Sequence, residues 1–591
     1  MMNHRVIPGC QCGSPRHGSS PSGSDRSVNV APTAGRRQER RGSVLLIVLV
    51  VVMLLTLGCY TFSQRMLAEA KAAETYEREV QARAFADSGI ELVAAILGNR
   101  SEDTTNLDLY DNPDLFQGML LRDSDNSYRR GRFSIVAGVG DDQTGQSIRF
   151  GLTDESAKLN VNTLADTEFN SDLSEEDSRD RLMALPEMTV EIADAILDWL
   201  DQDEKPRQNG AENEYYGTLD PPYETKNGRL ESLDELLQVR GVTAELLYGE
   251  DANHNGLLDP NENDGDLSPP ADNADGVLQS GWSAYLTIFS REANRRRDGN
   301  PRINVNQKNL ADLYDALLTE FDEETARFIT AYRLNGAASA GGTSAGIASV
   351  AGQSGGPTAG GGASRGTSGV AASSGSSRAS GSSGASGSSG ETRGGLDLSG
   401  GGKQKIDSLY ELIGTSVQAR VNGQQQTLDS PFKDDPESLE SFLPKLLDVL
   451  TTSADEFIEG RINIVHASKE VLSSIPDIDD ELVDRIVGAQ LSGSTVSGNA
   501  GDDLRSTSGW LLTQGLVKLD QMQTLDRYVT ARGDVYRAQV LGYYDSGGPQ
   551  VRLEAVIDAT QVPPRVISLR DLTDLGRGYD MDQLLQSHSG F

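Results

Sequence analysis

An uncharged apolar segment near the amino terminus constrains this chain more than any other feature. Residues 43–64 contain no Asp, Glu, Lys or Arg and are mostly Leu, Val, Ile and Met. About 20 apolar residues suffice to cross a bilayer as a helix. The preceding arm is rich in Arg and ends in Arg40, Arg41 and Gly42, and such an arm stays in the cytoplasm. The sequence therefore predicts a single membrane span with the bulk of the chain across the membrane.

Two interpretations of this segment compete. The first is a secretory signal peptide or a plain signal anchor, although the apolar core of a cleaved signal covers only about 7–15 residues. The second is cleavage before the apolar run, between Gly42 and Ser43. Residues 65–97 continue without Pro and with strong helix formers, so 43–97 reads as one helix about 80 Å long. Its second half is expected to be amphipathic, with apolar residues at near-helical spacing: Leu67, Ala70, Ala73, Val80, Ala84 and Val93.

The junction at Gly42 and Ser43, between a basic arm and an uncharged helix, resembles the processing site of type IV prepilins and type II secretion pseudopilins. Those proteins usually carry Glu as the fifth residue after cleavage, but this chain has Ile47. A buried carboxylate without a partner is costly. The missing Glu resembles one minor pseudopilin family, general secretion pathway protein K, which is thought to sit at the pseudopilus tip. The pattern W-x-D-x-D…G-A-E-x-x-Y-Y from Trp199, followed by N-G-R-L-E-S-L-D-E-L, is the most specific part of this resemblance.

Charge and cysteine content narrow the function classes. The leader holds seven of the 53 basic residues and two of the 88 acidic residues, so the mature chain carries 46 and 86, a net charge of −40. That charge repels nucleic acid and membrane surfaces and suits cation binding. Cys10 and Cys12 lie in the leader and Cys59 in the membrane segment. The soluble part therefore has no disulfide and no thiolate metal site.

The predicted fold class is α+β, with a small antiparallel sheet interrupted by a large helical insertion. Residues 98–130 read as a polar loop, and alternating apolar residues predict a hairpin over 131–153 and returning strands over 534–544 and 551–559. The predicted segments are a basic leader (1–42), a pilin-like stalk (43–97, with 43–64 in the membrane), the first part of the sheet (98–157), a helical domain (158–335), a disordered Gly/Ser-rich linker (336–402), a second helical region (403–525), and returning strands with a tail (526–591).

The insertion contains a repeat that begins K-L-N-V-N at Lys158, R-I-N-V-N at Arg302 and R-I-N-I-V at Arg461, each followed by two helical stretches. A variant of the helical pair covers 232–247. These units resemble helix-hairpin-helix or SAM-like modules, which makes DNA binding or uptake by a membrane-anchored protein a rival function. Their turns, L-P-E-M-T, V-R-G-V-T and I-P-D-I-D, lack the Gly-x-Gly that lets backbone N–H groups approach a phosphate. Packing modules are therefore the preferred interpretation, with no nucleic acid as a partner.

Two acidic loops are candidate structural calcium sites, because calcium takes six to eight oxygen ligands. The resemblance to protein K implies a cation site at Asp201, Asp203 and Glu212; the alternative is a solvated acidic loop with a structural Trp199. The second loop, D-A-N-H-N-G-L-L-D-P-N-E, matches the EF-hand pattern. Its expected ligands are Asp251, Asn253, Asn255, the Leu257 carbonyl, Asp259 and Glu262. An acidic, turn-rich loop without calcium remains the alternative there.

Catalysis is not expected, because the mature chain has three histidines (His254, His466 and His588) and no Walker, Rossmann or His-Glu-x-x-His motif. The resemblance implies a non-enzymatic minor pseudopilin in the bacterial inner membrane, with its amino terminus cytoplasmic and its bulk periplasmic. A prepilin peptidase would cleave after Gly42, and the new amine of Ser43 would be methylated. The implied partners are other minor pseudopilins, contacted through the stalk, and the secretion machinery. A minor pilin of a type IV pilus is a further alternative.

Overall fold

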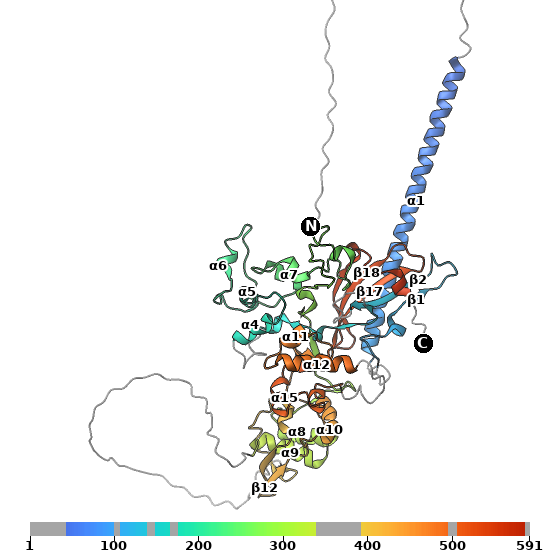
Figure 1. Cartoon of the computed structure of the whole chain (residues 1–591). Helices are drawn as coiled ribbons and strands as arrows, with labels where there is room; N and C mark the ends of the chain where they lie inside the picture. Colours follow the sequence, from blue (N-terminus) through green and yellow to red (C-terminus); the bar gives the residue numbers. More distant parts are fainter. Residues whose placement is uncertain are drawn as a thin grey trace, which may run out of the picture. The chain divides into compact units, whose positions relative to one another are not determined.

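The computed structural model of this chain describes residues 43–99, 107–138, 148–165, 175–338, 392–493 and 505–585 (Figure 1). The predicted leader (1–42) and residues 339–391 of the predicted linker lie outside the described residues. The chain divides into two compact units, residues 1–74 and 75–591, with the boundary inside the first helix.

Helix α1 (Ser43–Gly98) is continuous over 56 residues, so the predicted long helix is confirmed and ends one residue later than expected. Its apolar first part has a mean hydropathy of 2.8 over its most apolar stretch. By length and composition alone, α1 is the one helix in the described part of the chain that could cross a membrane. The apolar side chains of this part are exposed, as Leu45 and Met53 illustrate at 76% and 68% exposure.

The second half of α1 packs one face against a sheet, but that face differs from the predicted one. Of the predicted apolar positions, Val93 is buried, whereas Leu67, Ala70, Ala73, Val80 and Ala84 are exposed. The buried face follows i, i+3, i+4 spacing from Ala82. Its apolar members are Ala82, Phe85, Ala86, Ile90, Val93 and Leu97. Alanine occurs on both sides of the helix, so the apolar pattern alone does not identify the face that the sheet selects.

The sheet joins the two ends of the soluble part, as predicted. Its path is β1 (Met119–Arg122), β2 (Gly131–Gly138), β17 (Val535–Tyr544), β18 (Val551–Asp558) and β19 (Arg565–Asp571), all antiparallel. Two short strands complete it: β3 (Ile148–Arg149) pairs with β2 and β4 (Thr153–Asp154) with β17. In Figure 1, β1, β2, β17 and β18 gather around the second half of α1. The intervening chain is thus an insertion between β4 and β17.

Two parts of the sheet region were missed from sequence. The predicted loop 98–130 contains β1 and a short helix, α3 (Pro113–Phe116), which Asn112 caps by accepting the Leu115 N–H. The predicted tail contains β19, followed by η7 (Thr573–Leu575) and α16 (Met581–Leu585). β19 is exposed on both faces, so it lacks the alternation of apolar and polar residues that identifies a half-buried strand.

The insertion is built from three units that open and close in the same way. Each opens with a two-residue strand, and a second two-residue strand returns parallel to it. The pairs are β5 (Leu159–Asn160) with β6 (Leu286–Thr287), β8 (Ile303–Asn304) with β13 (Leu450–Thr451), and β15 (Ile462–Asn463) with β16 (Val529–Thr530). The three openings are the three copies of the predicted sequence repeat.

Side chains repeat along with these strands. In each opening strand the Asn side chain accepts the backbone N–H two residues ahead, and in each closing strand the Thr hydroxyl does the same. Such local bonds fix the turn that follows the strand. The Asn bonds are Asn162 N to Asn160 (3.1 Å), Asn306 N to Asn304 (2.7 Å) and Val465 N to Asn463 (3.0 Å). The Thr bonds are Phe289 N to Thr287 (3.1 Å), Ser453 N to Thr451 (3.2 Å) and Arg532 N to Thr530 (3.3 Å).

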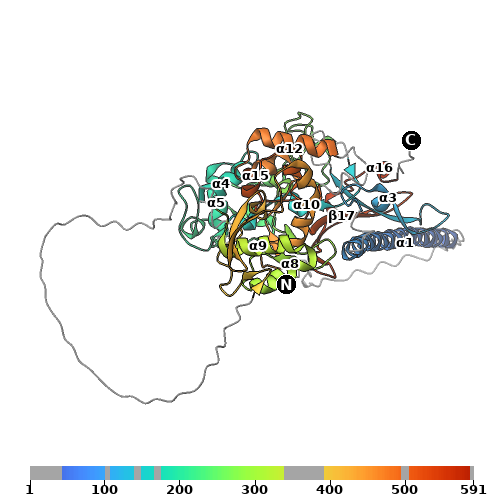
Figure 2. The ribbon, with the colours of Figure 1, turned by 90° about the horizontal axis from the view of Figure 1, so that it is seen from below.

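Helices fill each unit between its two strands. The first unit holds η2 (Val161–Thr163), α4 (Glu175–Met183), α5 (Val190–Leu200), α6 (Asn213–Tyr216), η3 (Leu233–Gln238), α7 (Ala244–Tyr248), η4 (Pro260–Glu262) and η5 (Trp282–Ala284). The second holds α8 (Leu310–Glu320), α9 (Glu323–Asn335), η6 (Leu409–Leu412) and α10 (Pro436–Val449). The third holds α11 (Lys469–Ser473), α12 (Asp480–Gly493), α14 (Trp510–Thr513) and α15 (Leu519–Leu525). Figure 2 shows α8 and α9 side by side, a helical pair of the kind that the repeats predicted.

The helical pairs begin at side-chain caps that the sequence places at their amino termini. Asn309 caps α8 and Asp322 caps α9, each by accepting a backbone N–H of the first turn. Ser232 and Glu235 form a capping box at η3, and Ser408 and Glu411 form the equivalent box at η6. The first two units therefore also share a 3-10 helix that begins with a Ser/Glu capping box, η3 in the first unit and η6 in the second.

Residues 392–429 differ from expectation. β9 (Thr392–Arg393) and β10 (Leu396–Asp397) form a hairpin inside the range predicted as linker, and Leu396 is buried. β11 (Ser416–Val421) and β12 (Gln424–Asp429) form a second hairpin inside the range predicted as helical. Its turn is Asn422-Gly423, with φ of 52° and 82°. Asn-Gly is the preferred sequence for a two-residue hairpin turn, a signal that the sequence interpretation passed over.

Three remaining elements lie before or between the units. η1 (Glu155–Ala157) precedes the first unit, and the Asp154 side chain caps it by accepting the Ser156 N–H. β7 (Arg291–Ala293), between the first and second units, pairs with β14 (Phe457–Glu459), between the second and third. The connections between units are thus themselves paired, which brings the starts of the second and third units close together.

Gly542 permits the close approach of α1 to β17. A Cβ built on Gly542 would lie 1.9 Å from the carbonyl oxygen of Ala82. Only glycine therefore fits at this position of β17.

We expect Gly542→Ala to lower the free energy of unfolding by about 1–3 kcal/mol or more, because helix and strand backbones would have to separate. Chemical denaturation measures this change. The control is Gly488→Ala, in α12, where a Cβ meets nothing within 4 Å; it should be neutral or stabilising by up to about 1 kcal/mol. Equal effects of the two substitutions would contradict the proposed contact.

Candidate metal centres

The first acidic loop, residues 198–216, begins at the end of α5, where three carboxylates share one helix face. Asp194 and Asp198 are fully buried and Asp201 caps the helix end. Their spacing, i, i+4 and i+7, places them on one side of the helix. Asp194 pairs with Arg179 at 2.7 Å. Sequence reasoning selected Asp201 and missed Asp198, although this spacing in D-A-I-L-D-W-L-D was a usable signal.

Arg207 is the cation that pairs with Asp198 and Asp201. Its Nη1 lies 2.7 Å from Asp198 Oδ1 and 2.5 Å from Asp201 Oδ2. Its backbone N–H also donates to Asp198. A Cβ on Gly210 would lie 1.8 Å from Asp198 Oδ2, so only glycine fits beside that carboxylate. One guanidinium therefore faces two acidic side chains in a tightly packed turn.

The other two predicted ligands of this loop lie in different surroundings. Asp203 is exposed and accepts the Lys205 N–H at 2.7 Å. Glu212 is 3% exposed, and neither of its carboxylate oxygens has a hydrogen-bond partner within the described residues. Burial, with repulsion from Asp198 and Asp201, raises the pKa of Glu212 to about 7. The structure thus associates Glu212 with Asp198 and Asp201 and leaves Asp203 in solvent.

Aromatic side chains hold this loop in place. Trp199 is 3% exposed and packs edge-on against Tyr216, with ring centroids 5.3 Å apart, and against Tyr223 at 6.3 Å. Tyr216 is itself fully buried. The W-x-D-x-D and Y-Y parts of the sequence pattern therefore meet in one aromatic cluster beneath the carboxylates.

The second acidic loop, Asp251–Glu262, folds around its own backbone amides. Asp251 accepts the N–H groups of Asn255 (3.0 Å) and Gly256 (2.9 Å). Glu262 accepts those of Ala252 (3.1 Å) and Asp259 (3.0 Å). Gly256 has a φ of 68°, as the sharp turn at the sixth position of an EF-hand loop requires.

Three of the predicted side-chain ligands of this loop, Asn253, Asn255 and Asp259, contact one another. The amide nitrogens of Asn253 and Asn255 donate to Asp259 Oδ2, at 2.5 and 3.0 Å. Asn253 Oδ1 is buried without a hydrogen-bond partner among the described residues. Leu257 is predicted to ligate through its carbonyl, and its side chain is buried in the core. Burial raises the pKa of Glu262 to about 7, with further contributions from Asp251 and Asp259.

Buried polar groups of β17, of β18 and of the segment between η7 and α16 hold the second loop. Gln539 donates to the His254 carbonyl at 2.8 Å, and Tyr579 donates to the Asn255 carbonyl at 2.8 Å. Arg552 donates to the Asn253 carbonyl. Sequence reasoning found none of these contacts, because the partners are separated by hundreds of residues. The loop is therefore positioned by the sheet and not by flanking helices, as it would be in an EF-hand.

In the described part of the chain, no three His, Cys, Asp or Glu side chains converge closely enough to form a preassembled metal cluster. The observations that fit a cation are of another kind: the unpartnered oxygens of Glu212 and Asn253 Oδ1, and the excess of carboxylates over the single Arg207. The calcium sites predicted from sequence stay predictions.

The histidines do not assemble a site either. His466 stacks on Tyr110, with ring centroids 4.4 Å apart and the planes inclined by 5°. His254 lies edge-on to Tyr248 at 5.1 Å. His588 lies outside the described residues. His254 belongs to the second acidic loop, but its ring packs against Tyr248. Among the described residues, these two histidines therefore serve as packing side chains.

Breaking the buried pair at Arg207 should destabilise the protein. We expect Arg207→Met to lower the free energy of unfolding by about 3–5 kcal/mol in calcium-free buffer, because Asp198 remains buried without a cation. The control is Lys469→Gln, which breaks an ion pair whose two side chains are 55% and 64% exposed; its cost should stay below about 1 kcal/mol. Urea denaturation compares the two variants. If both variants lose less than about 1 kcal/mol of unfolding free energy, Arg207 is not needed to compensate the buried charge of Asp198.

Part of the chain is similar to a known protein family. Residues 157–248, which include the first acidic loop, match the family model described as "Type II secretion system (T2SS), protein K". The resemblance predicted from the W-x-D-x-D pattern is therefore confirmed over this segment.

Individual relatives match over short stretches. Type II secretion system protein K of Aeromonas hydrophila is 50% identical over 58 residues, which is 10% of this chain and 18% of that protein. The protein of the same name from Pectobacterium carotovorum subsp. carotovorum is 42% identical over 55 residues, 9% of this chain and 17% of its own length. The chain thus spans less than a fifth of the length of these curated relatives.

Solved structures also include a similar chain. It belongs to the GspK-GspI-GspJ complex from the type 2 secretion system of enterotoxigenic Escherichia coli, with a TM-score of 0.33 and 10% sequence identity. The aligned region covers 85% of this chain and 99% of the solved chain. A similarity at this level does not establish a shared fold.

Proposed function

We propose that this chain is a minor pseudopilin of a type II protein secretion system, of the protein K kind, and that it acts without catalysing a reaction. The observation that carries the proposal is the protein K match over residues 157–248, in a chain that also begins with a long apolar helix. The second half of that helix packs on an antiparallel sheet, the arrangement expected of a pilin-like subunit.

Membrane anchorage follows from the first part of α1. Its apolar side chains are exposed among the described residues, and burying such a surface in lipid is favourable. The Arg-rich segment before it keeps the amino terminus in the cytoplasm. The chain would then be a bacterial inner-membrane protein, and the strongly acidic remainder would lie in the periplasm.

Association with other minor pseudopilins would use the same helix. Uncharged helices pack side by side in a membrane through van der Waals contacts, and α1 carries Ile47 where a Glu would otherwise need a partner. A subunit with no neighbour above it needs no such Glu. Together with the insertion from β5 to β16, which is too bulky to stack beneath another subunit, this supports a position at the pseudopilus tip, from which the chain would prime assembly.

Cleavage at Gly42 tests this function, because it is required for assembly but not for membrane insertion. In cells that make the full chain, mass spectrometry should find a mature protein beginning at methylated Ser43. Gly42→Val should abolish cleavage, since a branched side chain does not fit where glycine is required, and should reduce export of the host's secreted proteins to that of a deletion strain. The control Gly58→Ala, where a Cβ meets nothing within 4 Å, should be cleaved and should secrete normally.

Other outcomes would assign the chain elsewhere. A mature protein that starts beyond residue 60 would contradict the prepilin interpretation. Normal secretion with lost surface piliation would indicate a minor pilin of a type IV pilus. Lost DNA uptake with intact secretion would indicate a DNA-binding role for the helical repeats.

Calcium is the cation that we propose for the two acidic loops. In the first loop Asp201 and Glu212 would hold the calcium ion, with Asp198 beside them. In the second loop the ligands would be Asp251, Asn253, Asn255, the carbonyl of Leu257, Asp259 and Glu262. When bound, calcium supplies positive charge to carboxylates that otherwise repel one another. The chain's own contribution is to hold these oxygens: Glu212 and Asn253 have buried oxygens without donors. Cation binding would stabilise loops that carry no disulfide.

Calorimetry on the full chain in detergent would test these sites. Asp251→Ala with Glu262→Ala should remove one calcium, and Asp201→Asn with Glu212→Gln should remove another, whereas the exposed Glu231→Gln should remove none. Because the pKa values of Glu212 and Glu262 are raised to about 7, binding requires loss of their protons and should weaken as the pH falls from 8 to 6. Unchanged uptake in a double variant would eliminate that loop.

A further inference from the structure

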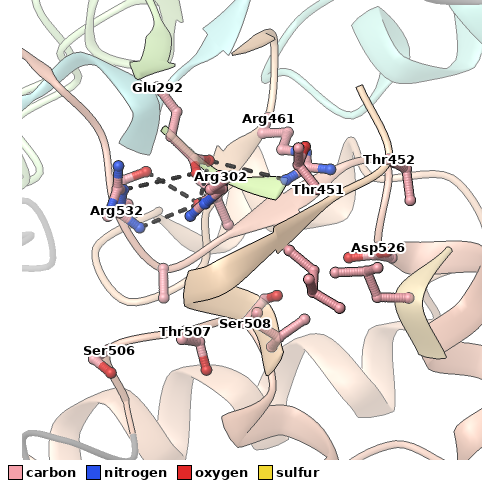
Figure 3. A pocket seen from close by; sticks show the side chains of 15 residues that line it. Glu292, Arg302, Thr451, Thr452, Arg461, Ser506, Thr507, Ser508, Asp526 and Arg532 are labelled. Carbon is pink, nitrogen blue, oxygen red and sulfur yellow. Dashed lines mark hydrogen bonds and ion pairs between the residues drawn. The ribbon is translucent and has the colours of Figure 1, made fainter. Parts of the chain in front are cut away.

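A group of arginines surrounds one buried glutamate where the second and third units begin. We call Glu292, Arg302, Arg461 and Arg532 the arginine cluster; Glu292 lies on β7, Arg302 and Arg461 directly precede β8 and β15, and Arg532 follows β16. In Figure 3 the three guanidinium groups surround the Glu292 carboxylate. The Glu292 side chain is 3% exposed, and those of the arginines are 9%, 20% and 22% exposed in chain order.

Glu292 does not satisfy all three arginines. Its Oε1 lies 2.9 Å from Arg302 Nη1 and 3.7 Å from Arg532 Nε, and its Oε2 lies 4.0 Å from Arg461 Nη1. Oε2 also accepts the Thr530 hydroxyl at 2.8 Å. Arg461 is thus the most weakly held, since a contact of 4.0 Å is too long for a hydrogen bond.

A second buried cluster in the same protein shows how charges are balanced when no ligand is needed. Arg537 lies 2.7 Å from Glu155 and 2.8 Å from Glu554. Lys158 lies beside them and donates to the Ser283 carbonyl at 2.9 Å. That cluster has two anions and two cations. The three arginines have two carboxylates within 4 Å: Glu292, which they share, and Asp534, which lies 3.6 Å from Arg532 Nη2. Three cations therefore face two anions, and Arg461, whose contact with Glu292 is 4.0 Å long, has the weakest pairing.

The arginine cluster also retains unused hydrogen-bond donors. Arg461 Nε and Arg532 Nε are buried and have no hydrogen-bond partner among the described residues. By contrast, Arg532 Nη2 donates to the carbonyls of Ala293 and Arg295, both at 2.9 Å, and Arg302 Nε donates to that of Asp448. A buried donor without an acceptor costs about 1–3 kcal/mol, and more for a charged group. An acceptor is therefore missing beside Arg461 and Arg532.

A small cavity lies where that acceptor would sit. Its volume is about 50 Å³ and its walls include the arginine cluster, Thr451, Thr452, Asp526 and the hydroxyls of residues 506–508. Figure 3 shows Ser506, Thr507 and Ser508 on the opposite side from the arginines. A single water needs about 10–15 Å³ of such space, so the cavity holds a few waters or one tetrahedral oxyanion, and is too small for a peptide.

Asp526 is the one carboxylate that faces the cavity besides Glu292. Its Oδ2 accepts the Ser408 hydroxyl at 2.7 Å, so this oxygen is engaged with η6. Burial raises the pKa of Asp526, opposed in part by Arg461, and its neutral form can donate a hydrogen bond. The polar part of the wall is thus made of guanidinium groups, hydroxyls and the Asp526 carboxyl, and Leu409, Leu447, Leu450 and Ala531 complete the lining.

We propose that this cavity binds one small inorganic oxyanion of the sulfate and phosphate class, held by Arg461 with Arg302 and Arg532. Guanidinium groups present paired donors that match oxyanion geometry, and the hydroxyls supply further donors. The anion would link the start of the second unit to the start and end of the third. Binding would be independent of the secretion role, so failure of one leaves the other intact.

Equilibrium dialysis with radiolabelled sulfate tests the proposal on the full chain in detergent. The wild type should bind close to one sulfate per chain, displaced by phosphate but not by the same ionic strength of chloride. Arg461→Gln should weaken binding at least tenfold. The matched control Arg565→Gln removes an exposed arginine on β19 and should bind as the wild type does, which separates the cavity from general surface charge.

Thr452→Val provides a second variant in case Arg461→Gln disturbs folding. It removes one hydroxyl from the wall without removing charge, and should weaken sulfate binding severalfold with an unchanged circular dichroism spectrum. No sulfate bound to the wild type, equal binding by Arg461→Gln and wild type, or tighter binding of acetate than of sulfate would each overturn the proposal. The last result would assign the cavity to a carboxylate instead.

Discussion

The pairing of β2 with β17 is the interaction on which the rest of the structure depends. It joins residues on either side of the whole insertion, through a register that sets Leu541 opposite Ser134 and Gly542 opposite Phe133. The same strands receive the buried face of α1, and Gly542 lets the helix backbone approach. Closing so long a loop is entropically unfavourable, and the compensation comes from the apolar core that helix and sheet form together. Without this pairing neither α1 nor the second acidic loop would have a surface to pack on.

The insertion is held together by polar interactions that repeat. Each unit fixes its first strand with an Asn side chain and its last with a Thr hydroxyl, and the parallel strand pairs bring its two ends together. Charge is then concentrated between units: Glu155 with Arg537 beside the first, and the arginine cluster between the second and third. Buried charges contribute little net stability, but they define which segments meet, and in a chain without disulfides in its soluble part this specificity has few other sources.

The sequence allowed much of the architecture to be predicted, for physical reasons that can be named. Residues 43–97 were predictable as one helix because they combine a long uncharged apolar run with strong helix formers, and the strands at 534–544 and 551–559 because they are rich in β-branched and aromatic residues. β19 was missed because it is exposed on both faces and has no alternation. The hairpin at Asn422-Gly423 was missed because its turn signal lay within a segment read as helical. For the acidic loops, local spacing selected Asp251 and Glu262 as candidate ligands, and helical spacing could also have selected Asp198. The roles of Arg207 and Arg552 depend on burial and on contacts across the fold, which a linear pattern does not contain.

The parallel closing strands have a consequence for how such a protein can grow. The first and last strands of each unit lie side by side. A copy of a unit can therefore be added or removed without moving the flanking chain. Duplication of one ancestral unit inside the loop between β4 and β17 would therefore leave the helix and sheet unaltered. The size of the insertion could change over evolutionary time while the part that packs against α1 stayed constant.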